Sequence, residues 1–86
     1  EWGGAGLDYI SLVVALEEIA AGDGAISTIV SVQNSLSCGI TQRYGTDVQK
    51  QKYLSKLATG EWLGCFCLTE PQAGSDAGAL ECKAVR

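Results

Sequence analysis

Apolar residues recur at helical spacing in the first part of the chain. Leu12, Leu16 and Ile19 lie on one stripe, as expected for an α-helix with a single buried face. Asp8 is a suitable N-cap before this stripe, because a side-chain oxygen there can accept the free amides of a first helical turn. The pattern predicts a helix that follows Asp8 and continues to about Ala21.

A second helix is predicted from about Gly24 to Tyr44, with Asp23 as its cap. It carries no charge between Asp23 and Arg43, and small or weakly polar residues separate its aliphatic ones. Such a helix is expected to be buried on most of its surface and approached closely by its neighbours. Burying it on all sides requires more than 86 residues, so we expect an internal piece of a longer protein.

A third helix is predicted from Thr46 to Gly60. Thr46 and Gln49 have the spacing of a capping box, in which each side chain bonds the backbone amide of the other residue. Gly45 separates this signal from the second helix, and Gly60 is placed to end the third.

The pattern changes to that of strands after Gly60. WLGCFCL, residues 62–68, is short, continuously apolar and followed by Pro71, which predicts a buried strand. ALECKAVR, residues 79–86, is predicted to be a second strand. The predicted fold class is therefore α+β, with three helices of an all-α domain in residues 1–60 and the first strands of a β domain in residues 61–86.

Composition excludes several classes of function. Hydrophobic residues make up 47% of the chain, which is typical of a folded segment. Six scattered basic residues and ten acidic ones give a net charge of −4. Nucleic acid and anionic membrane surfaces are poor partners, because both require a concentrated positive field. No apolar run is long enough to span a bilayer.

The chain has four cysteines and no histidine. Cys65 and Cys67 are two positions apart in a predicted strand, so they face the same side and lack the spacing of a CxxC redox pair or zinc site. We therefore expect free, buried thiols and no metal site.

Candidate chemistry lies in FCLTEPQAGSDAG, residues 66–78. Pro71 should end the strand at about Thr69, whose hydroxyl and amide are then free to bond a polar group. Gly74 allows a ligand to approach the backbone, and exposed amides in such a loop suit an anion or the edge of a polar ring. No Walker-type or GxGxxG phosphate loop is present. Local chemistry leaves open a plain turn in which Asp76 bonds its own backbone.

CLTEPQAGSDAGA resembles the signature of the acyl-CoA dehydrogenase family. EWGGAGLDY, LEEIA, QNSL and YGTDVQKQKYLSKLATGEW also resemble that family, most nearly its short-chain members, so the similarity covers nearly the whole chain. The resemblance implies a flavoprotein oxidoreductase that holds FAD between a helical N-terminal domain, a β-barrel-like middle domain and a C-terminal helical bundle. Such enzymes act in fatty acid beta-oxidation, convert acyl-CoA to trans-2-enoyl-CoA and usually pass electrons to electron-transfer flavoprotein.

The resemblance also implies cofactor contacts for individual residues. Thr69 would bond the pyrimidine edge of the flavin through its hydroxyl and amide, where negative charge gathers on reduction. Gln72 stands where many relatives have glycine, a departure that could shift the loop slightly. The implied FAD contacts are Phe66, Cys67, Leu68, Thr69, Gly74 and Ser75.

Substrate contacts are implied by the same resemblance. Ser75 would lie near the pantetheine arm of the CoA thioester, and Val32 and Gln33 would line the acyl cavity, with plain helix packing as the alternative for this pair. Glu70 and Asp76 are expected to be structural. The family's catalytic glutamate lies in its C-terminal domain, which nothing here matches. No catalytic residue is therefore assigned, and this piece alone is expected to be inactive.

Two other interpretations stay open. An acyl-CoA oxidase or a flavin-dependent hydroxylase would share the fold, and a non-catalytic helical interaction module would use the loop only as a turn. For a dehydrogenase, the resemblance implies a homotetramer or homodimer in the mitochondrial matrix or the bacterial cytoplasm.

Overall fold

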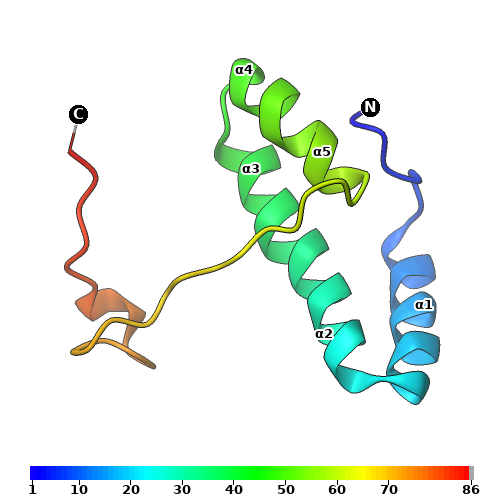
Figure 1. Ribbon diagram of the computed structural model, residues 1–86, viewed down its shortest axis with the longest axis horizontal. Coiled ribbons are helices and arrows are strands. Elements are labelled where there is room, and N and C mark those ends of the chain that lie inside the picture. Colours follow the sequence, from blue (N-terminus) through cyan, green and yellow to red (C-terminus); the bar gives the residue numbers. More distant parts are fainter. Residues whose placement is uncertain (86) are drawn as a thin grey trace.

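Helices form most of the part of the chain that the computed structural model describes, residues 1–85 (Figure 1). The elements α2, η1 and α3 are continuous and form one long middle helix. Helix α1 packs against its α2 part, and η2 and α5 pack against its η1 and α3 parts. The helical elements are α1 (Tyr9–Gly22), α2 (Gly24–Val32), η1 (Gln33–Cys38), α3 (Gly39–Tyr44), α4 (Asp47–Gln49), η2 (Lys50–Leu54), α5 (Ser55–Ala58) and η3 (Ala77–Ala79).

The predicted caps of the first two helices are confirmed. The Oδ1 atom of Asp8 accepts the amide of Ser11 at 2.8 Å and begins α1. Asp23 is the only residue between α1 and α2, and its Oδ1 atom accepts the amides of Ala25 and Ile26 at 2.8 and 3.1 Å. Because one residue both ends α1 and caps α2, the chain reverses at a sharp corner and the two helices pack side by side.

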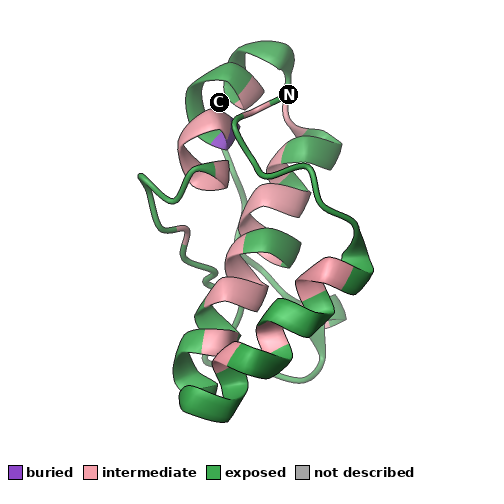
Figure 2. Cartoon of the chain, turned by 90° about the vertical axis from the view of Figure 1, so that its right-hand side faces the viewer, coloured by how far each residue is buried: buried purple, intermediate pink, exposed green. Residues whose placement is uncertain are grey.

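The second predicted helix is confirmed in extent, since α2, η1 and α3 follow one another without a break. Its centre, η1, is a π-helix, a wider form that is found mostly as short insertions within α-helices. The expected burial is wrong for the described residues, because Ile26, Ile29 and Ile40 are exposed. Helix α1, the α4–α5 region and residues 62–64 are the described parts that contact the middle helix, and they cover only some of its faces (Figure 2).

The third predicted helix is confirmed as the run α4, η2 and α5. Thr46 and Gln49 form the expected capping box: the Gln49 amide donates to the Thr46 hydroxyl at 3.3 Å, and the Thr46 amide donates to Oε1 of Gln49 at 2.8 Å. Gly60 follows the helix with a φ of +74°, a left-handed conformation that glycine adopts without steric cost.

The α+β prediction is wrong for the described residues. Within residues 1–85 there is no strand, and the isolated bridge between Glu70 and Ala73 is the only β-type pairing. A strand requires a neighbour for its backbone hydrogen bonds, and residues 62–68 have none here. The amides of Glu81 and Cys82, in the second predicted strand, instead donate to the Glu70 carboxylate. Position 86 of that predicted strand lies outside the described residues.

The cysteines are free, as predicted, but their expected burial is wrong for three of the four. Cys65, Cys67 and Cys82 are exposed, because the unpaired segments that carry them are not covered by other described residues. Cys38 is half-buried in η1, and this burial raises the pKa of its thiol, which favours the protonated form. No group of side chains suited to a metal occurs within residues 1–85, and no helix there has the length and apolar character needed to cross a membrane.

Candidate functional site

The candidate flavin-contacting segment, residues 66–69, is extended and exposed. Phe66, Cys67, Leu68 and Thr69 all lie on the surface of the described structure. Neither the hydroxyl nor the backbone amide of Thr69 donates a hydrogen bond to another residue between positions 1 and 85. Both donors of Thr69 are therefore available to a polar ligand.

A tight turn follows Thr69 and brings Gly74 back beside it. The amide of Glu70 donates to the carbonyl of Ala73 at 2.8 Å, and the amide of Ala73 donates to the carbonyl of Glu70 at 3.1 Å. Ala73 is only 1% exposed, so its methyl group is the inner side of this turn. A Cβ atom added to Gly74 would be 4.0 Å from Cγ2 of Thr69, which shows that the two predicted FAD contacts are neighbours.

Glu70 organises the rest of the loop through its carboxylate. Oε2 accepts the amide of Glu81 at 2.9 Å and Nε2 of Gln72 at 2.6 Å, and Oε1 accepts the amide of Cys82 at 3.0 Å. Led by the Glu81 amide, these hydrogen bonds lower the pKa of Glu70 below its ordinary value. The ionised side chain thus closes the loop between Thr69 and residues 81–82.

Asp76 and Ser75 lie within the closed loop. Oδ1 of Asp76 accepts the amide of Gly78 at 3.1 Å and caps the short 3₁₀ turn η3. This local bond agrees with the structural role expected for Asp76. Ser75 is exposed, and its hydroxyl makes no hydrogen bond to another residue in the described part of the chain. It is therefore free to bond a ligand, as Thr69 is.

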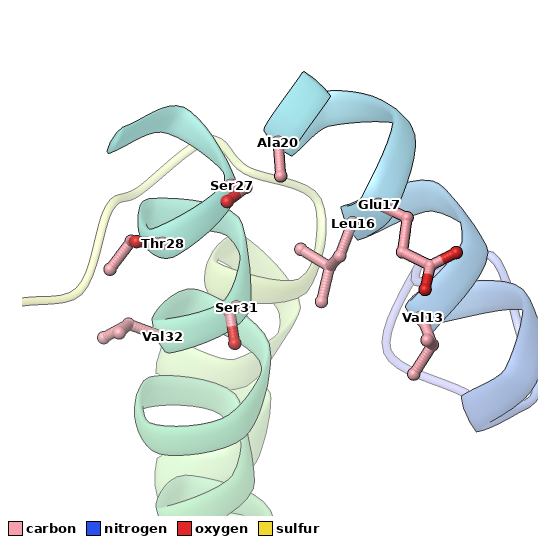
Figure 3. Close-up of a pocket in the computed structure, with 8 residues that line it drawn as sticks. All are labelled: Val13, Leu16, Glu17, Ala20, Ser27, Thr28, Ser31 and Val32. Atoms are coloured by element: carbon pink, nitrogen blue, oxygen red, sulfur yellow. The ribbon is translucent and has the colours of Figure 1, made fainter. Parts of the chain in front are cut away.

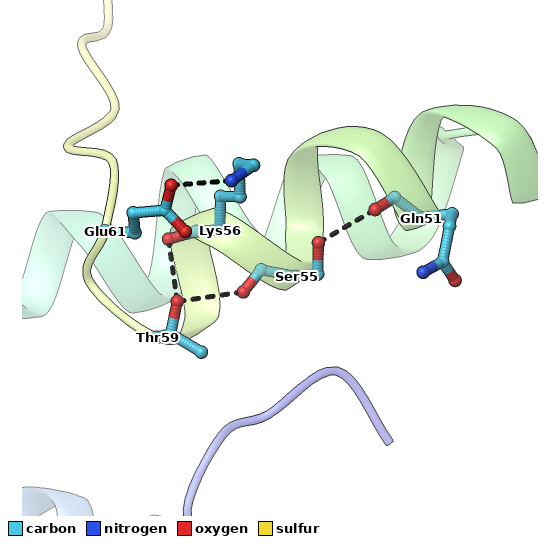
Figure 4. Close-up of polar contacts among 5 residues, drawn as sticks. All are labelled: Gln51, Ser55, Lys56, Thr59 and Glu61. Carbon is cyan, nitrogen blue, oxygen red and sulfur yellow. Dashed lines mark hydrogen bonds and ion pairs between the residues drawn. The ribbon is translucent and has the colours of Figure 1, made fainter.

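Polar contacts fix the place where the chain leaves α5 (Figure 4). Thr59 donates its hydroxyl to the carbonyls of Ser55 and Lys56 at 3.0 and 3.2 Å. Nζ of Lys56 pairs with Oε1 of Glu61 at 2.6 Å, and the Trp62 amide donates to the Lys56 carbonyl at 3.1 Å. The chain is thus held against the end of α5 until Trp62, four residues before Phe66.

Gln33 connects the π-helical segment η1 to this exit. Its Nε2 atom donates to the carbonyls of Leu57 and Trp62 at 2.8 and 2.9 Å. Its Oε1 atom accepts the amide of Gly64 at 2.9 Å. Both the nitrogen and the oxygen of the Gln33 side-chain amide are thus bonded to backbone groups. One of these groups, the Gly64 amide, lies two residues before Phe66, where the candidate flavin-contacting segment begins.

Val32, the other predicted acyl contact, lines a groove of about 380 Å³ between α1 and α2 (Figure 3). The hydroxyls of Ser27 and Thr28 each donate to the carbonyl of Gly24 in their own helix. Apolar and polar side chains both contribute to the groove walls. They are formed by Val13, Leu16, Glu17 and Ala20 from α1, and by Ser27, Thr28, Ser31 and Val32 from α2.

The structure brings some of the predicted site residues together and leaves others apart. Thr69 and Gly74 are neighbours, and Gln33 is bonded two residues before Phe66. Figure 1 shows the loop with η3 lying away from the helices, whereas the groove that contains Val32 lies between α1 and α2. The flavin-side and acyl-side residues therefore form two separate regions in the described structure.

Comparisons with known proteins assign the family. A family model described as acyl-CoA dehydrogenase, N-terminal domain, matches residues 1–61. The chain belongs to the acyl-CoA dehydrogenase family. It is 47% identical over 79 residues to the human mitochondrial short-chain specific acyl-CoA dehydrogenase, and 49% identical over 85 residues to a probable short/branched chain specific acyl-CoA dehydrogenase of Dictyostelium discoideum. A short-chain specific acyl-CoA dehydrogenase of Clostridium acetobutylicum is 46% identical over 85 residues.

These alignments include 92% to 99% of this chain but only 19% to 22% of the length of the three relatives. The similarity therefore concerns one region of the family's proteins. It extends through the helices and into the polar loop.

The sequence alone did not identify Gly64 and the backbone of Trp62 as partners of Gln33. An apolar strand pattern gives no signal for a glycine amide that bonds a side chain 31 residues earlier. The available signal was Gln33 itself, a long amide side chain in a helix of mostly small and aliphatic residues. A polar group in such surroundings must find partners, which directs attention to nearby backbone.

Proposed function

We propose that this chain is part of an FAD-dependent acyl-CoA dehydrogenase that oxidises a short acyl-CoA thioester to trans-2-enoyl-CoA. The observation that carries the proposal is its 46% to 49% identity to relatives named as such dehydrogenases, over 79 to 85 residues that include both the helices and the polar loop. A match of this length requires identical residues at many separated positions. A shared turn motif would produce similarity only in the loop.

Two domains are proposed within the chain. Residues 1–60 would be the last part of the helical N-terminal domain, and residues 61–86 the beginning of the middle domain. The family model's limit at residue 61 and the change from helices to extended backbone after Gly60 support this division.

The flavin side of the proposed site is residues 66–69 with Gly74 and Ser75. The amide and hydroxyl of Thr69 have no partner among residues 1–85, and the exposed backbone around Gly74 can be approached closely, so these residues fit a flat polar ring edge. When bound, FAD supplies the two-electron oxidation of the substrate. The contribution of Thr69 would be to hold two donors ready where negative charge develops, which requires no reorganisation during the reaction.

The substrate side is proposed to include Ser75 and Val32, whereas the side-chain amide of Gln33, the third residue expected there, is already bonded to backbone groups. Val32 would act through the groove between α1 and α2. Ser75 would act near the thioester through its hydroxyl, which bonds no other residue in the described part of the chain. Glu70 is not proposed as the base that removes the α-proton, because its lowered pKa and three accepted hydrogen bonds oppose proton uptake. That base would belong to another part of the enzyme.

Electron-transfer flavoprotein is the proposed electron acceptor, and a homotetramer or homodimer the proposed assembly. Relatives are described as mitochondrial in human and cattle, and others come from the bacteria Clostridium acetobutylicum and Bacillus subtilis. A mitochondrial matrix or bacterial cytoplasmic location is proposed accordingly.

The test uses the full-length protein with Thr69→Val and Ser75→Ala, singly and together. Each change removes one hydroxyl, so each is expected to weaken FAD or substrate binding by roughly threefold to tenfold, the effect of one hydrogen bond. Ser35→Ala is the matched control, because the Ser35 hydroxyl bonds the Ser31 carbonyl within its own helix. FAD titration and acyl-CoA-dependent dye reduction are measured.

A colourless wild-type protein that takes up no FAD and reduces no dye with acyl-CoA would refute the dehydrogenase. Release of peroxide under oxygen without reduction of electron-transfer flavoprotein would indicate an oxidase instead. FAD content and acyl-CoA affinity that are unchanged in the double variant would favour the helical interaction module, with the loop acting only as a turn.

A further inference from the structure

Gln33 has a hydrogen-bond arrangement that suits only a side-chain amide. Nε2 has two hydrogens, and both are used by the carbonyls of Leu57 and Trp62. Oε1 accepts the amide of Gly64, which is 31 positions away in sequence. Two carbonyl acceptors therefore lie at the NH₂ group of the side chain, and one amide donor lies at its oxygen, as a glutamine amide requires.

Close packing at Gly64 adds a second, independent contact. A Cβ atom built on Gly64 would overlap the Ser37 side chain, with 2.5 Å to its Cβ atom. No real Cβ contact is this short, so only glycine lets the backbone at position 64 approach η1 this closely. Gln33 and Ser37 both belong to η1, and together they hold residues 62–64 against it.

The contacts of Gln33 and Ser37 with residues 62–64 lie just before the candidate flavin-contacting segment. Gly64 is two residues before Phe66 and five before Thr69, and the intervening residues are extended and exposed. Beyond position 64 the described chain runs away from the helices, as Figure 1 shows. The direction in which residues 65–69 leave the helices is therefore set at the contact of Gln33 and Ser37 with Gly64.

We propose that Gln33 is a positioning residue for the flavin-contacting segment and acts through Gly64 rather than by touching the acyl chain. The effect of Gln33 on FAD binding rests on the proposed function, whereas the contact between Gln33 and Gly64 rests on the structure alone. It also separates the roles of two adjacent residues. Val32 is one of the residues that line the groove between α1 and α2, and Gln33 bonds the start of the segment that leads to Thr69.

The experiment compares Gln33→Met and Gln33→Glu in the full-length protein. Methionine keeps the length of the side chain and removes all three hydrogen bonds. Glutamate keeps the shape and the acceptor for Gly64, but it places an anionic oxygen beside two carbonyl oxygens that need a donor. Gln51→Glu is the matched control, since Gln51 is exposed and its side chain bonds no residue in the described part of the chain (Figure 4).

Three quantities are measured: hydrogen exchange of peptides covering residues 62–68 without FAD, FAD affinity, and the ratio of kcat/KM for a short and a longer acyl-CoA. Both Gln33 variants are expected to speed exchange by about tenfold, because the side-chain hydrogen bonds that hold residues 62–64 are lost or weakened. FAD affinity falls in parallel, with Gln33→Glu at least as severe as Gln33→Met. The chain-length ratio stays within twofold of wild type, and Gln51→Glu changes none of the three quantities.

Unchanged exchange in both variants overturns the inference, as does a shifted chain-length ratio with normal FAD affinity, which would indicate an acyl contact. A wild-type protein that binds no FAD refutes the proposed function, while the exchange of residues 62–68 still decides the contact. If the Gln33 variants do not fold, Gly64→Ala gives the same test with Gln33 intact. It should displace residues 62–64 and weaken FAD binding, and combining it with Ser37→Gly should restore both.

Discussion

Glu70 lies directly beside Thr69, yet its carboxylate is directed to the backbone of residues 81–82. We expect Glu70→Gln to open this loop, because a neutral amide can offer one acceptor and would place its NH₂ group against an amide hydrogen. Hydrogen exchange at Glu81 and Cys82 should become several-fold faster. Gln72→Ala is the control, since it removes the third partner and keeps the carboxylate. Unchanged exchange in Glu70→Gln would contradict the closed loop.

The same carboxylate gives the loop a pH dependence. The backbone amides of Glu81 and Cys82 lower the pKa of Glu70 in the folded loop, so the ordering they provide is present at neutral pH. It should be lost as the pH falls through this lowered pKa, when the carboxylate takes up a proton. Proteolysis within residues 69–82, followed at decreasing pH, should accelerate in wild type. The acceleration should be small in Glu70→Gln, and equal acceleration in both proteins would disprove the assignment.

Residue-level prediction succeeded where the partner is close in sequence. Asp8, Asp23 and Thr46 each bond amides within three positions, so the residue type and its place before a helix were sufficient. The backbone partners of the Gln33 and Glu70 side chains lie 11 to 31 positions away. Every residue has the same backbone groups, so the sequence does not show which of them a distant side chain will bond. The candidate residues of the loop could therefore be predicted, but the hydrogen bonds that hold the loop in place could not.

At the scale of elements, helices and strands differ in where their backbone hydrogen-bond partners come from. The three helical runs follow from local patterns, because every helical hydrogen bond joins residues of the same segment. A strand depends on a neighbour, and WLGCFCL has an apolar strand pattern without a partner among residues 1–85. The π-helical course of η1 was also unpredicted, because the spacing of apolar residues does not distinguish it from an α-helix.

The corner between α1 and α2 depends on Asp23. We expect Asp23→Ala to reduce the local stability of the start of α2 by about 1 kcal/mol, the usual effect of removing an N-cap side chain. Hydrogen exchange at Ala25 and Ile26 would report this change, because their amides lose the Oδ1 acceptor. Glu18→Ala, on the exposed side of α1, should leave those two amides unaffected. Exchange that does not change in Asp23→Ala would show that another group caps α2.

At the scale of the whole molecule, the described chain is extended rather than compact. Its radius of gyration is 15.0 Å, whereas about 12 Å is expected for an independent domain of this length. Leu54 and Ala73, at 3% and 1% exposure, are the only buried hydrophobic residues between positions 1 and 85. Tyr9 and Ile10, by contrast, are 86% and 75% exposed. The helices therefore have defined ends and caps but little apolar burial to hold them together.

This imbalance predicts how a peptide of residues 1–86 will behave alone. Helix caps act locally, whereas cooperative unfolding requires a shared core, so we expect a broad, non-cooperative loss of helical circular dichroism on heating. The exposed apolar side chains should bind a hydrophobic dye, as loosely packed states do. In the full-length protein the same residues should exchange slowly, because the proposed further domains would cover them. A monomeric peptide with a sharp transition and no dye binding would show instead that these helices form a self-sufficient core.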